Sequence, residues 1–345
     1  MRPIDILMDL CWGSCGKGKF APLLAKRDEY DVVATANGPN AGHTRIHNGQ
    51  REIFKCLPSA SGLSPIAALC PTSVSGRERL LMELGRASEV IIHENARLLL
   101  DTDARMEESS PWAKHGSTCQ GTALPMIRRI TRQPEGRIAD AEIQWPNHVR
   151  IVDNVAWRER MFASKILFEG AQGHELSVDW GEFPYTTSRN CTTGAALDAM
   201  GISPRRLRNV YGLFRAHPIR VGNPVGGYSG PLPYETTWRK ILDDANAPSD
   251  YPIEQLELTT VTKRLRRVTD LDLERLYDAC QMNGVNQLIL NFAQYLDWAA
   301  EGVTEWARLP PIVLDFIKKI ENVTGIEIAA VGTSETAECW REDAH

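Results

Sequence analysis

A chain of 345 residues with a formal net charge of −5 at pH 7 can bury a large core, but it lacks the broad positive field of nucleic-acid-binding proteins. We therefore expect no direct nucleic-acid binding. The first residues contain no apolar signal segment, and no apolar run approaches the length of a membrane span, so we expect a cytoplasmic protein without membrane contact. Eight cysteines without a CxxC pair indicate reduced thiols.

Short apolar runs alternate with helical patterns, which predicts an α/β fold with a mainly parallel central sheet flanked by helices. The expected strands are 4–10, 31–36, 89–93, 165–168, 209–214, 287–291 and 327–331. The expected helices are 20–26, one opening at a capping box at 75–78, 269–282 and one beginning at 310–311. A hairpin turning at 48–49 and a long ordered loop at 218–252 complete one domain over 1–345 with small loop and hairpin subregions.

A glycine-rich run, CWGSCGKGK, joins the first expected strand to the first expected helix and ends at Lys19. Strand, glycine turn and helix form a phosphate-binding geometry, because backbone N–H groups can approach an anion there while Lys17 and Lys19 add positive charge. The run is not the common P-loop, since Phe20 stands where that motif needs a hydroxyl, and Ala21 replaces the third glycine of GxGxxG. The expected ligand is a nucleotide.

Three further clusters contain residues that could bind a ligand or take part in catalysis. NGPNAGHT at 37–44 follows the second expected strand and contains His43, while FEGAQG at 168–173 again runs from a strand into a glycine turn. Ligands of open parallel sheets bind at the carboxyl ends of the strands, where these clusters and the glycine-rich run all fall. The basic run TTVTKRLRR at 259–267 suits a carboxylate or phosphate through bidentate guanidinium contacts.

Together these clusters resemble the adenylosuccinate synthetases. The family's loop QWGDEGKGK corresponds to CWGSCGKGK at 11–19, while NAGHT at 40–44 and FEGAQG at 168–173 match letter for letter. PYTTSRNCTTG at 184–194 is close to the family's PYVTSSNTTAG, and GST at 116–118 stands where the family has GTT. The resemblance covers most of the chain, from residue 1 to about 333.

The resemblance implies an adenylosuccinate-synthetase-like fold and a two-step ligase. A nucleoside triphosphate phosphorylates O6 of a 6-oxopurine nucleotide, and the amine of L-aspartate then displaces that phosphate at C6, with Mg²⁺ as cofactor. The resemblance also implies a homodimer, because Arg132 matches a family arginine that reaches the nucleotide bound by the partner subunit.

The resemblance also assigns site residues. His43 would stabilise the leaving β–γ bridge oxygen and Gln172 would hold the base, so the implied catalytic residues are Ser14, Lys17, His43 and Gln172. The implied triphosphate site comprises Gly13, Ser14, Cys15, Gly16, Lys17, Gly18, Lys19, Gly42, His43, Thr44, Asn291, Gln294 and Gly332, with the Gly42 carbonyl on the metal. The implied purine-monophosphate site comprises Ser14, Asn40, Ala41, Ser117, Thr118, Arg132, Gln172, Thr187 and Arg220. The implied aspartate site comprises Val261, Thr262, Arg264 and Arg266.

Two departures from the family pattern bear on the substrates. Ser14 stands where the family has the aspartate that takes the N1 proton of hypoxanthine, and Cys15 replaces the following glutamate. A neutral hydroxyl is a poor general base, but a short side chain leaves room for the 2-amino group of guanine. Such a replacement is typical of the phage-type branch, the 2-aminoadenylosuccinate synthases, so we expect dGMP as substrate for 2-aminoadenine DNA synthesis. The sequence leaves open which group removes the N1 proton. The carboxylate of the substrate aspartate is one candidate.

The second departure lies at 290–294, where LNFAQ replaces the TKxD-type run with which GTP-using members read guanine. A glutamine or asparagine amide can pair with adenine, which favours ATP or dATP, although a guanine site built from backbone contacts stays open. Two other functions also stay open. One is an IMP-dependent, GTP-using adenylosuccinate synthetase, and the other is an inactive nucleotide-binding regulatory protein.

Overall fold

The computed structural model describes residues 2–222, 228–253, 257–258 and 265–344. Within them a ten-stranded sheet has the order β17-β16-β15-β11-β1-β10-β2-β5-β7-β9, with neighbours parallel except β16 and β17. This confirms the predicted fold class. The strands are β1 (Ile4–Asp9), β2 (Val32–Thr35), β5 (Ile66–Leu69), β7 (Glu89–His93), β9 (Val149–Val152), β10 (Ile166–Glu169), β11 (Leu207–Arg215), β15 (Gln287–Asn291), β16 (Ile328–Gly332) and β17 (Glu338–Trp340).

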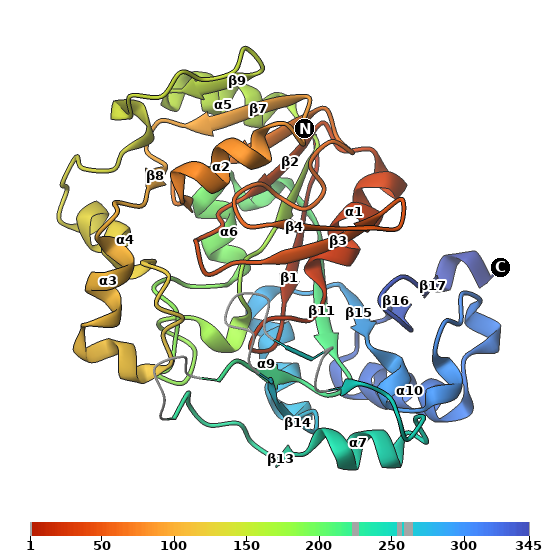
Figure 1. Ribbon diagram of the computed structural model, residues 1–345. Coiled ribbons are helices and arrows are strands. Elements are labelled where there is room, and N and C mark those ends of the chain that lie inside the picture. The colour runs from red at the N-terminus through yellow and green to blue at the C-terminus, as the bar shows by residue number, and fades with distance from the viewer. Residues whose placement is uncertain (1, 223–227, 254–256, 259–264, 345) are drawn as a thin grey trace.

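Helices flank this sheet, and small sheets extend it (Figure 1). In that view β7 and β9 lie at the top, β16 and β17 at the right above α10, and α3 and α4 in a separate group at the left. The helices are α1 (Lys17–Asp28), α2 (Arg77–Leu84), α3 (Asp103–Glu108), α4 (Ala123–Ile130), α5 (Asn154–Ala163), α6 (Thr193–Met200), α7 (Trp238–Asp244), α9 (Leu273–Asn283) and α10 (Pro311–Thr324). The small sheets pair β3 (His43–His47) with β4 (Gln50–Phe54), β6 (Val74–Ser75) with β8 (Arg97–Leu98), and β14 (Arg267–Thr269) with β12 (Ile219–Arg220) and β13 (Glu235–Thr236). Across the described residues, no helix is both long and apolar enough to cross a membrane.

Several predicted elements differ from the observed ones. The capping box at 75–78 is wrong, because Ser75 pairs with Leu98 in the β6–β8 sheet and α2 begins after Gly76 without a side-chain cap. Helix α9 begins at Leu273 with Asp272 as its cap rather than at Thr269, which pairs in β14. The segment 218–252 is more than a loop, since it contains α7 and two short strands. The hairpin turning at 48–49 is confirmed.

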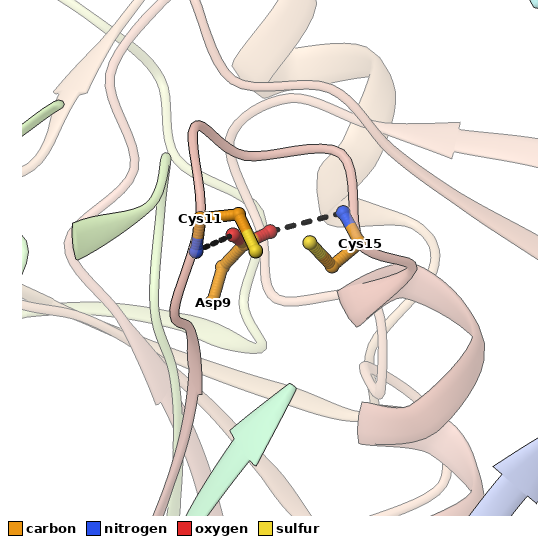
Figure 2. A group of neighbouring side chains, drawn as sticks. All are labelled: Asp9, Cys11 and Cys15. Carbon is orange, nitrogen blue, oxygen red and sulfur yellow. Dashed lines mark hydrogen bonds between the residues drawn. The ribbon is translucent and has the colours of Figure 1, made fainter. Parts of the chain in front are cut away.

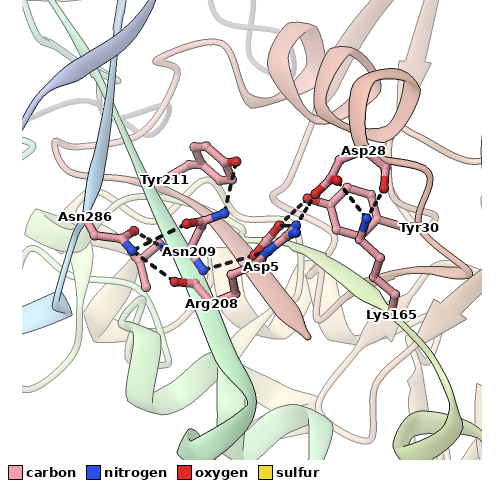
Figure 3. Close-up of polar contacts among 9 residues, drawn as sticks. Asp5, Asp28, Tyr30, Lys165, Arg208, Asn209, Tyr211 and Asn286 are labelled. Carbon is pink, nitrogen blue, oxygen red and sulfur yellow. Dashed lines mark hydrogen bonds and ion pairs between the residues drawn. The ribbon is translucent and has the colours of Figure 1, made fainter. Parts of the chain in front are cut away.

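A polar cluster ties the central strands together at the end opposite the glycine-rich run (Figure 3). Asp5 of β1 is fully buried and accepts hydrogen bonds from the Tyr30 hydroxyl, the Arg208 guanidinium and the Asn209 N–H. Arg208 also pairs with Asp28 at the end of α1. Since one carboxylate joins β1, β11 and the segment that follows α1, the first strand is held in place before the chain enters the glycine-rich run.

Candidate active site

A cavity of about 1500 Å³ is lined by residues that follow the carboxyl ends of β1, β2, β10 and β15. This is the edge of the sheet at which the sequence clusters were expected to meet. Most of the predicted site residues line this cavity: Gly13, Ser14, Gly16, Lys17, Gly18, Lys19, Asn40, Ala41, Gly42, His43, Thr44, Ser117, Thr118, Gln172, Thr187, Arg220, Arg266, Asn291 and Gln294.

The remaining predicted residues lie elsewhere. Cys15 is completely buried, and Arg132 is exposed with φ +60° and is not among the residues that line the cavity. Gly332 packs against Asn291, since a Cβ on this glycine would lie 2.0 Å from Asn291 Oδ1. Three predicted aspartate ligands lie outside the described residues, namely Val261, Thr262 and Arg264.

The glycine-rich loop curls around a carboxylate that the sequence analysis did not assign. Asp9, the buried last residue of β1, accepts hydrogen bonds from the N–H groups of Cys11 (3.0 Å) and Gly13 (3.2 Å) through Oδ1 and of Cys15 (2.9 Å) through Oδ2. Figure 2 shows the Asp9 carboxylate between the two cysteines. Positive φ angles at Gly13 (+88°), Ser14 (+59°) and Gly16 (+104°) allow the tight turns that aim these N–H groups inward.

Lys17 is oriented by the same carboxylate. Its ammonium is buried, 3.1 Å from Asp9 Oδ2 and 2.6 Å from the Gln172 carbonyl oxygen. An ammonium group has three protons, so after these two contacts one remains for a ligand in the cavity. Asp9 thus connects the loop backbone, the lysine and the segment after β10.

Asp9, Cys11 and Cys15 offer atoms within 4.8 Å of one another, a spacing that could hold a metal ion. The carboxylate oxygens, however, already accept three N–H groups and the Lys17 ammonium. Burial raises the pKa of the Cys15 thiol well above its usual value, which disfavours the thiolate that a metal needs. We therefore interpret the group as the support of the loop.

The loop is also fixed from its two sides. Asn291 at the end of β15 donates to the Cys15 carbonyl (2.8 Å), and a Cβ on Gly16 would lie only 2.1 Å from that amide nitrogen. Lys19 donates to the carbonyls of Ser334 (3.0 Å) and Ala337 (2.5 Å). Burial lowers the pKa of Lys19 to about 8. The ammonium of Lys19 therefore anchors the segment after β16, whereas Lys17 is the lysine placed for a ligand.

His43 is held by a second buried carboxylate. Its Nδ1 lies 2.5 Å from Oε1 of Glu169, the last residue of β10, and Glu169 also accepts hydrogen bonds from the Ser59 N–H (2.6 Å) and hydroxyl (2.8 Å). This close contact positions the imidazole, although Nδ1 has no partner in hydrogen-bond geometry among the described residues, and it leaves Nε2 as the atom that can meet a ligand. Glu169 belongs to the FEGAQG motif, but its role was not predicted because the sequence does not show which group it faces.

Three predicted residues from separate segments form a row in the cavity. Gln172 Nε2 donates to Asn40 Oδ1 (3.1 Å), and Asn40 Nδ2 donates to Thr187 Oγ1 (3.5 Å). Gln172 Oε1 is buried and has no hydrogen-bond partner among the described residues, so it can accept a hydrogen bond from a bound base. Ser14 is the exposed residue of the neighbouring loop.

Near the carboxyl end of β15 the cavity has an aromatic wall with two amide acceptors. Phe292 stacks on Tyr295, and the Arg215 guanidinium lies 4.1 Å from the Phe292 ring centre. Asn291 Oδ1 and Gln294 Oε1 are buried without hydrogen-bond partners within the described part of the chain. An acceptor beside an aromatic face suits a purine that presents an amino group.

Arg266 and Arg220 are only partly available to a ligand. Arg266 and Arg215 each donate to Glu257 at 2.8 Å. Arg220 donates to the carbonyls of Ser229, Tyr185 and Pro231, and burial lowers its pKa to about 10. The guanidinium of Arg220, a predicted monophosphate ligand, is thus directed at the protein's own backbone.

A glycine-rich phosphate loop, a carboxylate-held histidine and a large cavity at the strand ends define a nucleotide-dependent phosphoryl-transfer enzyme of the open parallel-sheet class. The adenylosuccinate synthetase family model matches residues 6–142 and 139–301. The chain belongs to the adenylosuccinate synthetase family, whose members are carbon–nitrogen ligases.

Relatives and solved structures agree with this assignment. The chain is 35% identical over 312 residues to the N6-succino-2-amino-2'-deoxyadenylate synthase of Vibrio phage phiVC8, covering 86% of this chain and 87% of that relative. It is 31% identical over 345 residues to the adenylosuccinate synthetase of Flavobacterium psychrophilum, covering 83% and 77%. A structure of the Cyanophage S-2L succinoaminodeoxyadenylate synthetase bound to dGMP and dATP superimposes with a TM-score of 0.82 at 31% identity, covering 98% of this chain and 95% of that one. Adenylosuccinate synthetase from Plasmodium falciparum shares the fold, with a TM-score of 0.78 at 18% identity over 99% and 100% of the two chains.

Replacing Asp9 by asparagine should lower both the free energy of unfolding and the affinity for the triphosphate. The amide keeps one acceptor oxygen but places an N–H₂ group against N–H donors and the Lys17 ammonium. Breaking a buried ion pair in this way costs about 3 kcal/mol of unfolding free energy. Denaturant unfolding and calorimetric titration with ATP measure the two effects, with the exposed Asp179→Asn as the matched control. Unchanged ATP affinity in Asp9→Asn would show that the carboxylate does not organise the loop.

Glu257 should make stability depend on acid pH. Burial opposes its charged form, but Arg215 and Arg266 outweigh that effect and lower its pKa from 4.5 to about 2. A lowered folded-state pKa contributes stability above pH 4.5, and this contribution is lost as the pH falls from 4.5 towards 2. Glu257→Gln should therefore lose on the order of 3 kcal/mol at pH 7, and its deficit against the unmodified protein should shrink by pH 3. The exposed Glu305→Gln should show neither effect, and a deficit for Glu257→Gln that is constant with pH would contradict the ion-pair interpretation.

Proposed function

We propose that this enzyme joins L-aspartate to C6 of dGMP with ATP or dATP as phosphoryl donor. The reaction proceeds through a 6-phosphoryl intermediate and yields 2-amino-2'-deoxy-N6-succinyladenylate, ADP (or dADP) and phosphate, for synthesis of 2-aminoadenine DNA. The observation that carries the proposal is Ser14, an exposed hydroxyl in the cavity where the family has an aspartate. The phage relatives named above support it, because the cyanophage enzyme is described with dGMP and dATP bound.

The purine is proposed to lie between Ser14 and Gln172. An aspartate at position 14 would bring a carboxylate next to N1, where the 2-amino group of guanine also needs space. The short serine leaves that space, and the unpartnered Gln172 Oε1 supplies a hydrogen-bond acceptor. Because Ser14 is neutral and Asp9 is enclosed by the loop, we propose the carboxylate of the bound L-aspartate as acceptor of the N1 proton.

The triphosphate is proposed to lie against the loop at 13–19 and the segment 42–44. Lys17 directs its remaining proton to the phosphates, and His43 donates through Nε2 to the β–γ bridge oxygen while Glu169 contacts its Nδ1. The carbonyl oxygen of Gly42, which lines the cavity, fits the oxygen ligation that Mg²⁺ prefers, with phosphate oxygens completing the set. Mg²⁺ bound there would neutralise charge on the transferring phosphoryl group.

The donor base is proposed to be adenine. Phe292 lines this part of the cavity, and the unpartnered oxygens of Asn291 and Gln294 can accept from an exocyclic amino group. A guanine would place its carbonyl oxygen at the same position and meet an acceptor there.

The other ligand groups follow from the residues that line the cavity. We propose that Asn40, Ala41, Ser117, Thr118 and Thr187 receive the monophosphate substrate. The substrate aspartate would be held by Arg266 together with Val261, Thr262 and Arg264, three residues outside the described ones. We further propose that residues 1–345 act as one unit within a homodimer, with the exposed Arg132 reaching the neighbouring site, in the cytoplasm of a host cell.

A substrate panel tests the activity. Purified protein with Mg²⁺ and L-aspartate is given ATP or GTP and one of dGMP, GMP, dIMP or IMP, and phosphate release is followed. We expect the highest rate with dGMP and ATP. Turnover of IMP with no turnover of dGMP would support an ordinary adenylosuccinate synthetase instead, and no phosphate release with any pair would support a regulatory protein.

The variant Ser14→Asp tests the pocket argument. The longer, charged side chain should crowd the 2-amino group and reduce kcat/KM for dGMP by about tenfold or more, within the range of discrimination that one misplaced group provides. The control is Ser249→Asp at an exposed position, which should leave the rate unchanged. An undiminished dGMP rate in Ser14→Asp would show that this residue does not provide room for the base.

A further inference from the structure

Arg189 is a partly buried arginine without a role in the preceding scheme, and two nitrogen atoms of its guanidinium are fully buried. It lies within PYTTSRNCTTG, at a position where the family pattern has serine. Its Nη1 donates to the Ala36 carbonyl, whereas Nε and Nη2 are buried with no hydrogen-bond partner among the described residues. Two unpaired donors on one buried guanidinium are unusual, because buried polar groups in proteins are almost always hydrogen-bonded.

The charge of this guanidinium is also not compensated. No ion pair between the described residues includes Arg189, and the charged side chain with an electrostatic effect on its guanidinium is Arg129, which repels it. Its other titratable neighbours are the thiols of Cys70 and Cys191, and burial raises the pKa of both, to about 11 for Cys191, so that they stay neutral. Burial and Arg129 accordingly lower the pKa of Arg189. A buried cation without an anion is costly, so a bound anion would relieve a strain in the unligated protein.

The place of Arg189 points to the anion. A Cβ on Gly38 would lie 3.2 Å from Arg189 Nη2, 2.9 Å from Asn40 Oδ1 and 3.3 Å from Thr122 Cγ2. Asn40 and Thr122 line the cavity, and Thr122 Oγ1 is another buried atom without a partner within the described residues. The guanidinium therefore lies directly behind the part of the cavity wall that Asn40, Thr122 and Thr187 form.

We propose that Arg189 is the intrachain counter-charge for the 5'-phosphate of the purine monophosphate, acting together with Asn40, Thr122 and Thr187. The inference rests on the proposed function in so far as a nucleoside monophosphate occupies this end of the cavity. Within one chain it supplies a positive charge that Arg220, which is directed at backbone carbonyls, does not supply. Arg132 is proposed to serve the neighbouring site, and Arg189, which does not line the cavity itself, would act from behind Asn40 and Thr122. Absence of a Cβ at Gly38 lets the guanidinium approach this wall.

Binding measurements test the proposal. Isothermal titration of Arg189→Gln and Arg189→Lys with dGMP and with deoxyguanosine separates the phosphate from the rest of the ligand. Arg189→Gln should bind dGMP about tenfold or more weakly while its deoxyguanosine affinity is unchanged, since a positive charge close to the phosphate is lost. The dGMP affinity of Arg189→Lys should fall between those of the unmodified protein and Arg189→Gln. The salt dependence of dGMP binding should decrease in Arg189→Gln.

The control is Arg206→Gln. Arg206 is also buried, but its guanidinium donates to the carbonyls of Arg2, Met161 and Ser164, so its loss should lower stability and leave the ratio of the two affinities unchanged. Equal weakening of dGMP and deoxyguanosine in Arg189→Gln, or no weakening, would overturn the proposal. If Arg189→Gln does not fold, the ratio of dGMP to deoxyguanosine affinity in Arg189→Lys tests the proposal in the same way.

The same measurements keep this inference apart from the proposed function. Turnover of dGMP by the unmodified enzyme with an unchanged dGMP affinity in Arg189→Gln would refute only the role of Arg189. An Arg189-dependent affinity for IMP, combined with no turnover of dGMP, would refute only the choice of substrate. An unmodified protein that binds none of the monophosphates would refute both.

Discussion

The contact between the Asp9 carboxylate and the glycine-rich loop is the constraint on which the site depends. Three loop N–H groups and the Lys17 ammonium all point at this one buried anion, so the loop keeps its curvature without a bound phosphate. The cost of burying a carboxylate is offset by donors on every side. Lys17 also contacts the Gln172 carbonyl, and therefore the same carboxylate indirectly sets the relation between the phosphate loop and the base end of the cavity.

A second buried carboxylate repeats the arrangement one strand away. Glu169 ends β10, neighbour of β1, and fixes His43 much as Asp9 fixes Lys17. Both carboxylates stand at the last residue of a fully buried parallel strand, and each orients one cationic or protonatable side chain. The sheet thus places two acidic residues at the ends of neighbouring strands, with Glu169 in register with Leu7, two residues before Asp9. The residues proposed to touch ligands come mainly from the loops that follow these strands.

Sequence patterns predicted the parallel sheet and the hairpin, and most of the predicted site residues line one cavity, because apolar runs, glycine turns and motif letters are local signals. They did not reveal Glu169 as an organiser, since Ser59, one of its partners, lies 110 residues away along the chain and leaves no local trace. Asp9 has its partners within eight residues, but the sequence does not show that the loop turns its N–H groups back onto this carboxylate. Strand β5 was missed because its sequence IAAL is buried on both faces but rich in alanine. The capping box at 75–78 failed because pairing of Ser75 in a strand overrode a local preference.

The anchoring of Lys19 has a consequence for how the site is made. Its ammonium is held by carbonyls of Ser334 and Ala337, so a loop encoded near the start of the chain is completed only by residues more than 300 positions later. During synthesis, residues 334–337 must leave the ribosome before this corner of the cavity can close. A nascent chain that has not yet reached these residues therefore lacks the finished phosphate site.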